Sequence, residues 1–325
     1  MDLVTGASGF LGNVLVRELK KEGRDIRALL RNTSSRRPLK DLDIEIFNGD
    51  ILDAGSLYRA FKNIDTVYHA AGFVTILGGQ KELIHRINVQ GTRNVIDACI
   101  RMGVRKLVFT SSVTAIKEPP DGAKIDETLS FCADNKRSFY DISKAVSSIE
   151  VLTSLKNGLD AVIVCPTGII GPYDFNITPM TQFFIDYLNK KLRVKISGAY
   201  DFVDVRDVAV GHILAGKKGK KGQTYILSGQ KLTMDELFRL LEIETGIKAP
   251  RYDVPVRVAR FASEFIPLIY RFKKSSPCFT KYSIDTLQKK CDFSYQKAYE
   301  ELGYNPRPIK ESISDAIRWL RENMP

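Results

Sequence analysis

Histidine and cysteine are scarce in this chain, which has three histidines and five cysteines among 325 residues. The cysteines are odd in number and scattered without a C-x-x-C pair, and the histidines lie far apart with no ligand spacing. This pattern favours reduced thiols over a disulfide framework and gives no support to a structural zinc site. We therefore expect a cytoplasmic protein without a bound metal. The residues concerned are Cys99, Cys132, Cys165, Cys278, Cys291, His69, His85 and His212.

Long apolar runs are also missing. No segment approaches the roughly 20 consecutive apolar residues that a membrane-spanning helix needs, and no signal-peptide pattern precedes the first apolar segment. An integral membrane protein is therefore not expected. With 44% hydrophobic residues and this length, the chain can bury a full core, and we expect one large domain and a smaller one.

Acidic residues are outnumbered, with 38 Asp and Glu against 49 Lys and Arg and a net charge of +11. A basic balance favours anionic partners such as a phosphorylated cofactor, a membrane surface or nucleic acid. The basic residues are dispersed and no zinc-finger or RNA-recognition motif accompanies them, so we do not expect nucleic-acid binding. Residues 255–274 combine apolar positions at helical spacing with arginines and lysines, which would suit peripheral contact with a membrane. Because Pro267 interrupts this pattern, we favour a lobe-packing helix pair or a substrate lid.

A glycine-rich stretch near the start of the chain organises the other motifs. The residues before it, Leu3 and Val4, are typical of a strand, and residues 14–19 after it are typical of a helix. The glycines therefore fall in a strand-to-helix turn, which brings backbone N–H groups and the positive end of a helix to a pyrophosphate. We predict a dinucleotide-binding site that includes Gly6, Ser8, Gly9, Phe10, Leu11 and Gly12.

The end of the second predicted strand decides between two cofactors. An acidic residue there would bind the ribose hydroxyls of NAD, whereas a basic residue accommodates the phosphate of NADP. The chain has Arg31 at this point, followed by Arg36 and Arg37. Because arginine suits bidentate phosphate contacts, we predict NADP, with NAD as the alternative. After the third predicted strand, Asp50 and Ile51 are expected to bind the adenine.

Strands and helices alternate through residue 165, which predicts an α/β fold with a Rossmann-type, doubly wound parallel sheet and a smaller, mostly helical C-terminal lobe. We assign the first 165 residues to the dinucleotide-binding domain and expect residues 200–228 to return to it. The substrate lobe would then consist of residues 166–199 and 229–325.

Three later segments have recognisable local patterns. Residues 167–172 follow a buried strand and are expected to form a loop. Residues 202–209 are expected to introduce a helix. Thr233 is expected to open another helix, because it has the form of a capping box with Glu236.

Three side chains carry groups suited to proton transfer. Ser112 ends a buried predicted strand, at the edge where open parallel sheets place their ligands. Tyr140 and Lys144 are four residues apart at the start of a predicted helix, so they lie on one face of it. Each could be a surface side chain by itself, but together they form a candidate proton-transfer pair.

The glycine turn, Ser112 and the Tyr140–Lys144 pair together resemble the motifs of the extended short-chain dehydrogenases/reductases, and the likeness covers nearly the whole chain. Within that family the chain is more similar to dihydroflavonol reductases and hydroxysteroid dehydrogenases than to sugar-nucleotide enzymes. Sugar-nucleotide dehydratases have an Asp-Glu pair after the catalytic hydroxyl, whereas this chain has Val-Thr-Ala-Ile at residues 113–116. The resemblance implies an oxidoreductase that acts on a CH–OH or C=O group with an NAD(P) cofactor.

The resemblance also implies a role for each residue. Tyr140 would exchange a proton with the substrate oxygen, Lys144 would lower the pKa of that phenol and anchor the nicotinamide ribose, and Ser112 would hold the substrate oxygen. Thr114 is the alternative hydroxyl, and Asn88 would support the site through its helix backbone or serve only the fold. Implied cofactor contacts are Ala70, Ala71, Gly72, Asn88, Tyr140, Lys144, Pro166, Thr167, Gly168 and Ile169.

The substrate is defined only by class. Phe183, Phe184 and Tyr187 are expected to line an apolar pocket or to pack in the core. An apolar pocket favours a small-molecule ketone, aldehyde or alcohol on a hydrophobic or aromatic skeleton, and a homodimer is one candidate assembly. Two alternatives stay open, an NAD-dependent sugar-nucleotide epimerase and a non-catalytic nucleotide-sensing protein that uses the fold without chemistry.

Overall fold

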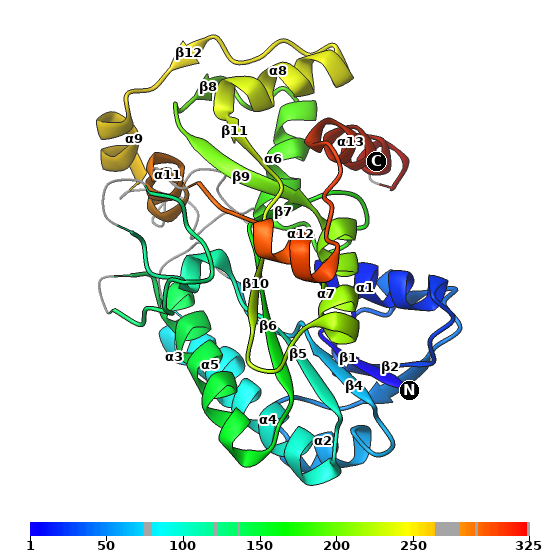
Figure 1. Ribbon diagram of the computed structural model, residues 1–325. Helices are drawn as coiled ribbons and strands as arrows, with labels where there is room; N and C mark the ends of the chain where they lie inside the picture. Colours follow the sequence, from blue (N-terminus) through cyan, green and yellow to red (C-terminus); the bar gives the residue numbers. More distant parts are fainter. Residues whose placement is uncertain (75–79, 120–122, 135–136, 264–279, 290–291, 324–325) are drawn as a thin grey trace.

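A seven-stranded parallel sheet forms the lower half of the molecule in Figure 1. The computed structural model describes residues 1–74, 80–119, 123–134, 137–263, 280–289 and 292–323. The strand order is β10-β6-β5-β4-β1-β2-β3, so the order reverses next to β1, at the boundary with β4. A reversal of this kind leaves a crevice at the carboxyl ends of the strands. The strands are β1 (Asp2–Thr5), β2 (Ile26–Leu30), β3 (Glu45–Asn48), β4 (Thr66–His69), β5 (Lys106–Thr110), β6 (Ala161–Pro166) and β10 (Thr224–Leu227).

Successive residues of the central strands pack on opposite faces of the sheet. Leu3 and Leu107 belong to one buried apolar cluster, whereas their neighbours Val4 and Val108 belong to another. This alternation follows from the two-residue period of a strand, and burial of both faces is typical of a parallel sheet. The predicted doubly wound sheet is therefore confirmed.

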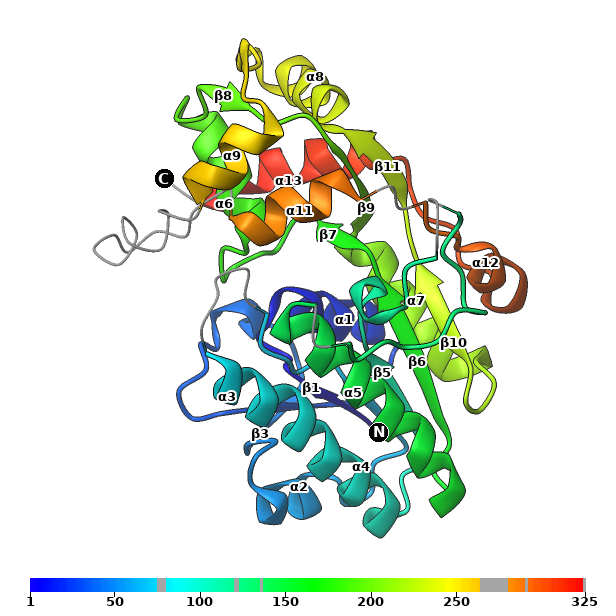
Figure 2. The same ribbon diagram turned by 90° about the vertical axis from the view of Figure 1, so that its left-hand side faces the viewer.

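Helices cover both faces of the sheet. Figure 2 shows α3, α4 and α5 side by side on one face, and α1 packs against α7 on the other. A π-helical turn joins α3 to α4, and such turns often occur at functional sites. The elements are α1 (Phe10–Lys21), α2 (Ala54–Ala60), α3 (Lys81–Ile84), the π-helix His85–Gln90, α4 (Gly91–Met102), α5 (Phe139–Ser154) and α7 (Val205–Lys218), with short 3-10 turns at Arg37–Leu39, Val113–Ala115 and Leu155–Asn157.

A second, smaller lobe lies above the carboxyl ends of the large sheet (Figure 1). Its core is aromatic and aliphatic and packs between helices and a three-stranded sheet of order β11-β9-β7. Its elements are β7 (Gly168–Ile170), α6 (Pro179–Leu188), β8 (Val194–Lys195), β9 (Ala199–Asp204), β11 (Gln230–Thr233), α8 (Met234–Thr245), β12 (Tyr252–Asp253), α9 (Val256–Ser263), α11 (Lys281–Gln288) and α13 (Ile309–Asn323).

Two local predictions need correction. Residues 167–172 were expected to be a loop, but Gly168–Ile170 form β7, which pairs in parallel with β9. Such a short strand has no pattern of its own, and only its distant partner defines it. The helix expected from residues 202–209 begins at Val205, because Ala199–Asp204 form β9.

Side-chain caps mark where several helices begin. The Asp204 carboxylate accepts a hydrogen bond from the backbone N–H of Arg206 at the start of α7. The predicted capping box is confirmed, since the Thr233 hydroxyl accepts from the backbone N–H of Glu236 and the Glu236 carboxylate accepts in return from the backbone N–H of Thr233. Each cap satisfies backbone groups that the first helical turn leaves without partners.

The two lobes are joined by an ion-pair network beside the large sheet. Arg206 contacts Asp204 at 2.7 Å and Asp315 of α13 at 2.8 Å, and Arg307 contacts Asp207 at 2.8 Å. Before Arg307 in the chain, α12 (Gln296–Leu302) packs against α7 and β10. The predicted division into domains stays a prediction. In the structure α7 and β10 lie with the large sheet, while β9 belongs to the small one.

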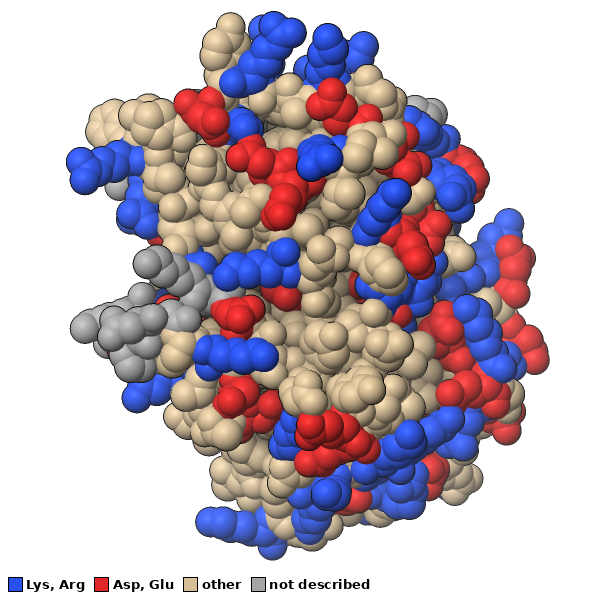
Figure 3. Space-filling model, turned by 45° about the horizontal axis from the view of Figure 1, so that its top comes forward, with Lys and Arg blue, Asp and Glu red and all other residues tan. Residues whose placement is uncertain are grey.

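The charged side chains do not form a basic stripe on the face drawn in Figure 3, where lysines and arginines are interspersed with aspartates and glutamates. Among the described residues, no helix has both the length and the apolar character that crossing a membrane requires. Of residues 255–274, expected to form a lobe-packing helix pair or a substrate lid, the structure describes 255–263, where Val258 and Phe261 of α9 are exposed. Residues 264–274 of that segment lie outside the described residues.

Candidate active site

The glycine turn between β1 and α1 is built to accept nothing larger than glycine at two positions. A Cβ on Gly12 would lie 2.1 Å from the carbonyl oxygen of Gly6, and a Cβ on Gly6 would lie 2.7 Å from the backbone of Ala71. Gly6 also has a φ of +69°, which favours glycine. The N–H of Gly9 donates to the carbonyl oxygen of Gly6 at 2.8 Å. The backbone of β1, α1 and the end of β4 therefore meet in a cradle open to a phosphate group.

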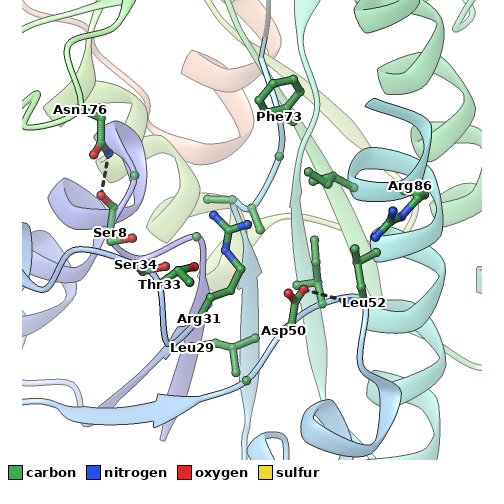
Figure 4. Close-up of a pocket in the computed structure, with 18 of the residues that line it drawn as sticks. Ser8, Leu29, Arg31, Thr33, Ser34, Asp50, Leu52, Phe73, Arg86 and Asn176 are labelled. Carbon is green, nitrogen blue, oxygen red and sulfur yellow. Dashed lines mark hydrogen bonds between the residues drawn. The ribbon is translucent and has the colours of Figure 1, made fainter. Parts of the chain in front are cut away.

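A cleft of about 650 Å³ runs from this cradle along the carboxyl ends of β1, β2, β3 and β4 (Figure 4). It lies where the strand order reverses, between β1 and β4. The predicted cofactor residues that line it are Gly6, Ser8, Gly9, Arg31, Asp50, Ile51, Ala70, Ala71 and Gly72. The predicted residues that do not line it are Phe10, Leu11, Gly12, Arg36, Arg37, Asn88, Tyr140, Lys144, Pro166, Thr167, Gly168 and Ile169.

Several of the residues outside the lining have other contacts. Phe10 and Leu11 pack against the apolar cluster beneath the sheet. The Thr167 hydroxyl donates to the buried Asp201 carboxylate at 2.6 Å, which fastens β7 to β9. The Asn88 side chain accepts from the N–H of Phe73 at 2.7 Å and donates to the Ser143 hydroxyl at 2.9 Å. Asn88 thus holds the backbone after β4 against α5.

Sequence reasoning missed other residues of the cleft. Thr33, Ser34 and Ser35 follow Arg31 along its rim, and their hydroxyl-rich run was visible in the sequence. Arg86, on the π-helix, and Asn176, from the smaller lobe, also line the cleft. No local pattern identifies these last two, because only the tertiary structure brings their segments to the cleft.

The helix α5 presents Tyr140 and Lys144 on one face, as their spacing predicts. The Ser138 hydroxyl caps this helix by accepting from the N–H of Asp141 at 3.1 Å. The Lys144 Nζ is buried and donates to the carbonyl oxygen of Thr110 at 2.8 Å. A Cβ on Gly72 would lie only 3.3 Å from that nitrogen, and Gly72 lines the dinucleotide cleft. The ammonium group therefore stands at the end of the cleft.

One hydroxyl stands beside the Tyr140 phenol. Burial raises the pKa of Tyr140, the Asp141 charge raises it further, and a hydrogen bond with the Ser112 side chain lowers it. The lowering of this pKa that was expected from Lys144 is not found, because burial outweighs the other effects. Ser112 and Thr114 are 3.0 Å apart, oxygen to oxygen. The structure thus brings together Ser112 and Tyr140, with Thr114 next to Ser112.

The charge of Lys144 is held in an apolar environment. Burial lowers the pKa of its ammonium to about 8, because a desolvated cation is unfavourable. The ammonium also lies over the Phe109 ring, 5.2 Å from its centroid. A lysine with a pKa near neutrality is typical of functional sites.

A tyrosine from the smaller lobe contacts the residue next to Tyr140. The Tyr282 hydroxyl, on α11, donates to the buried Asp141 carboxylate at 3.0 Å. Tyr282 also lines two neighbouring pockets, a charged one of about 460 Å³ and an apolar one of about 190 Å³. No sequence pattern pointed to Tyr282, since 141 positions separate the two partners.

The apolar pocket is lined mainly by aromatic rings and methionines of α6, β9 and α8. Of the three residues expected to line a pocket or the core, Phe183 lines this pocket, whereas Phe184 and Tyr187 lie in the core of the smaller lobe. Hydroxyls of Tyr282, Ser283 and Thr286 stand on one side. The other lining residues are Gly168, Pro179, Met180, Tyr200, Phe202, Met234, Leu237 and Leu287.

Two buried histidines near the sheet take no part in this arrangement. Burial lowers the pKa of His69 to about 3 and that of His212 to about 4. Each ring is held by hydroxyl groups, His69 by Thr5 at 2.7 Å and His212 by Thr110 at 2.8 Å. They are therefore neutral packing residues. Among the described residues, no cluster of His, Cys, Asp and Glu could hold a metal ion.

The fold and the site define an NAD(P)-dependent oxidoreductase of the extended short-chain dehydrogenase/reductase type. The glycine cradle fits a dinucleotide pyrophosphate, and the cleft ends at the Lys144 ammonium. The chain belongs to the NAD dependent epimerase/dehydratase family, whose sequence model matches residues 3–228.

Three relatives illustrate this membership. The chain is 35% identical to "Sterol demethylase protein B" of Methylococcus capsulatus over 98% of both chains. It is 31% identical to a putative dihydroflavonol 4-reductase of Synechocystis, over 98% of this chain and 94% of that protein. The crystal structure of gox2253 superposes with a TM-score of 0.87 and 33% identity, over 100% of this chain and 98% of that one. The predicted resemblance to this family and to reductases within it is confirmed.

Proposed function

We propose that the protein is an NADPH-dependent reductase, or the reverse dehydrogenase, that interconverts a ketone or aldehyde and an alcohol on a bulky hydrophobic skeleton. One observation carries the proposal. Lys144 stands beside Gly72 of the dinucleotide cleft, Tyr140 is hydrogen-bonded to Ser112, and Tyr282 of the apolar pocket donates to Asp141, the residue next to Tyr140. We take Ser112, Tyr140 and Lys144 as the junction between the cleft and the pocket. A carbonyl placed there would lie between a proton donor and a cofactor.

The three side chains would divide the work of carbonyl reduction. The Tyr140 phenol donates its proton to the carbonyl oxygen, and the Ser112 hydroxyl holds that oxygen by hydrogen bonding. The buried Lys144 ammonium stabilises the phenolate that remains, because opposite charges attract strongly where water is excluded. Bound NADPH would supply the hydride that the carbonyl carbon accepts. In alcohol oxidation each proton moves the other way.

The cleft supports NADP over NAD. Arg31 lines its rim after β2 and is followed by Thr33, Ser34 and Ser35. Figure 4 shows the Arg31 side chain extending into the cleft. A guanidinium with several hydroxyls beside it suits a phosphate, whereas an acidic residue would suit the ribose hydroxyls of NAD.

The pocket supports a hydrophobic substrate. Its walls include Met180, Phe183 and Phe202. Tyr282, which also lines the pocket, donates to Asp141, the residue next to Tyr140. A sugar nucleotide would need many polar partners, because unpaired hydroxyl groups are costly to bury. The relatives named for sterols and dihydroflavonols are consistent with a polycyclic or aromatic skeleton for this chain as well.

A spectrophotometric screen tests the proposal. Purified protein is mixed with NADPH or NADH and with steroid ketones, flavonoids, aliphatic ketones and sugar nucleotides, and absorbance at the reduced nicotinamide band is followed. We expect NADPH consumption with a ketone of the first two groups. Tightly bound NAD together with conversion of a UDP-sugar would instead identify an epimerase. Cofactor binding without turnover of any compound would support a nucleotide sensor.

A further inference from the structure

Residues 173–178, here called the strap, cross from the smaller lobe to the glycine turn. The strap follows β7 and leads into α6. The Asn176 amide donates to the carbonyl oxygen of Ser8 at 2.9 Å (Figure 4), and the Asn13 amide of α1 donates to the carbonyl oxygen of Tyr173 at 3.1 Å. The strap is thus fastened at two points to the segment that cradles the pyrophosphate.

The strap is held in an unusual backbone conformation. Tyr173 has a φ of +73° and Ile177 a φ of +53°, a region that non-glycine residues seldom adopt and that β-branched residues avoid. The fully buried Asp174 carboxylate fixes the chain between them by accepting from the N–H groups of Asn176 and Thr178, at 3.2 Å and 2.7 Å. Strain of this kind persists where surrounding contacts over-determine it, and it is common at ligand clamps.

The strap also contacts the arginine loop after β2. The guanidinium of Arg37 lies over the Phe175 ring, with its carbon 5.5 Å from the ring centroid. Ser35 and Asn176, which stand near these two residues in the sequence, both line the dinucleotide cleft. The stacked pair therefore sits at the rim of the cleft. Stacking uses the face of a guanidinium and leaves the N–H groups at its edge for a phosphate.

The other side of Phe175 faces the C-terminal helix. Its ring meets Trp319 of α13 edge to face, with centroids 5.2 Å apart and planes at 84°. Trp319 is buried and is the sole tryptophan of the chain. Phe175 thus contacts both Arg37, in the loop after β2, and Trp319 of the smaller lobe. The fluorescence of Trp319 can therefore report on Phe175.

We propose that the strap completes the dinucleotide site from the smaller lobe. Phe175 is a positioning residue that holds Arg37 toward the 2′-phosphate of NADPH, and Asn176 fastens the strap over the pyrophosphate cradle. The role of Phe175 rests on the NADP preference in the proposed function. The role of Asn176 does not, because both cofactors carry the pyrophosphate.

The test compares dissociation constants of NADPH and NADH for the wild-type chain and for Phe175→Leu, Arg37→Ala, their double variant and Asn176→Ala. We expect Phe175→Leu to weaken NADPH roughly fivefold and to leave NADH unchanged, and the double variant to be no weaker than Arg37→Ala. Asn176→Ala should weaken both cofactors by a similar factor. Phe175→Tyr, which keeps the ring, should retain the preference, and Arg239→Ala, at an exposed position of α8, is the control.

The emission of Trp319 provides a second measurement. Binding of NADP⁺, which does not absorb at the emission wavelength of tryptophan, should change the fluorescence of the wild-type chain and should do so less in Phe175→Leu. Circular dichroism of each variant checks that it folds.

Several results would overturn the inference. Phe175→Leu and Arg37→Ala effects that add in the double variant would remove the link between the two residues. If Phe175→Leu weakens the binding of NADPH and NADH equally, Phe175 is only a packing residue. If Asn176→Ala leaves both affinities unchanged, Asn176 does not help to bind the cofactor. If the wild-type chain prefers NADPH and this preference survives in both Phe175→Leu and Arg37→Ala, the role of Phe175 is refuted and the proposed function stands. A wild-type chain with equal affinities would refute the cofactor choice of the proposed function and the role of Phe175 together.

Discussion

The dinucleotide cleft and the apolar pocket are built in different ways. The cleft is formed by the ends of neighbouring parallel strands, and backbone atoms and glycines make its phosphate cradle. The pocket is formed by side chains of α6, β9, α8 and α11, which lie on segments spread over more than a hundred residues. The cleft therefore recognises a shape that many dinucleotides share, whereas the pocket recognises volume and polarity. The proposed junction lies between them: Lys144 stands beside Gly72 of the cleft, and Tyr282 of the pocket donates to Asp141, the neighbour of Tyr140.

The largest effect is expected at the junction. Replacing Tyr140 by Phe removes the proton donor and should lower kcat by roughly 10²- to 10⁴-fold, while the dissociation constant of NADPH stays within about a factor of two. Steady-state kinetics and fluorescence titration measure the two quantities. Tyr282→Phe is the matched control, since it removes a nearby phenol that donates to Asp141, and it should keep most of the activity. Comparable losses in both variants would contradict the assignment of Tyr140.

A change confined to the cleft should alter cofactor choice without altering the substrate. Arg31→Asp places a carboxylate where the 2′-phosphate is expected, so like-charge repulsion should weaken NADPH by roughly 30- to 100-fold. NADH should be affected little. The ratio of kcat/KM for the two cofactors measures this shift. Arg239→Ala serves as the control, because Arg239 is exposed on α8 of the smaller lobe and does not line the cleft. Equal effects on NADPH and NADH would remove Arg31 from the phosphate site.

A change confined to the pocket should weaken substrate binding and leave cofactor binding unchanged. Met180→Gln puts an amide into an apolar wall, and we expect KM for a hydrophobic ketone to rise about tenfold, because the amide must lose water without a partner. The affinity for NADPH should not change. Ile243→Gln, at an exposed position of the same lobe, is the control. If KM stays constant in Met180→Gln, the substrate binds elsewhere.

The smallest effect is a pH dependence at the junction. Burial lowers the pKa of Lys144 to about 8 from its ordinary value of 10.5. The ammonium is therefore present below pH 8 and lost above it, so kcat/KM of the free enzyme should fall by a few-fold as the pH rises through 8. The folded chain holds this proton less tightly than the unfolded chain, so this group's contribution to the free energy of unfolding should rise between pH 8 and 10.5.

Profiles of kcat/KM and denaturant midpoints across this range measure both trends. Lys144→Met should have lower activity, and its kcat/KM should no longer fall as the pH rises through 8. If kcat/KM of that variant still falls in this range, another group causes the pH dependence.

The parts of the site that sequence predicted best are those with local geometry. Gly6, Gly9 and Gly12 needed only a strand before them and a helix after them to be identified as a phosphate cradle. Tyr140 and Lys144 needed only helical spacing. In contrast, β7 was taken for a loop, because three residues carry no periodicity and β9 alone defines their pairing. Arg37 was predicted at the phosphate, yet its ring partner Phe175 could not be foreseen from the sequence.

The sequence by itself determined the alternation of strands and helices through residue 165, the position of the glycine turn and the shared helical face of Tyr140 and Lys144. These depend on neighbours within a few residues, where backbone preferences and hydrophobic periods act. Only the tertiary structure decided that Asn176 and Phe175 reach the dinucleotide cleft, that Tyr282 contacts Asp141 and that Met180 and Phe183 share one pocket. Those contacts join segments far apart in the chain, and they exist because the smaller lobe packs over the carboxyl ends of the large sheet.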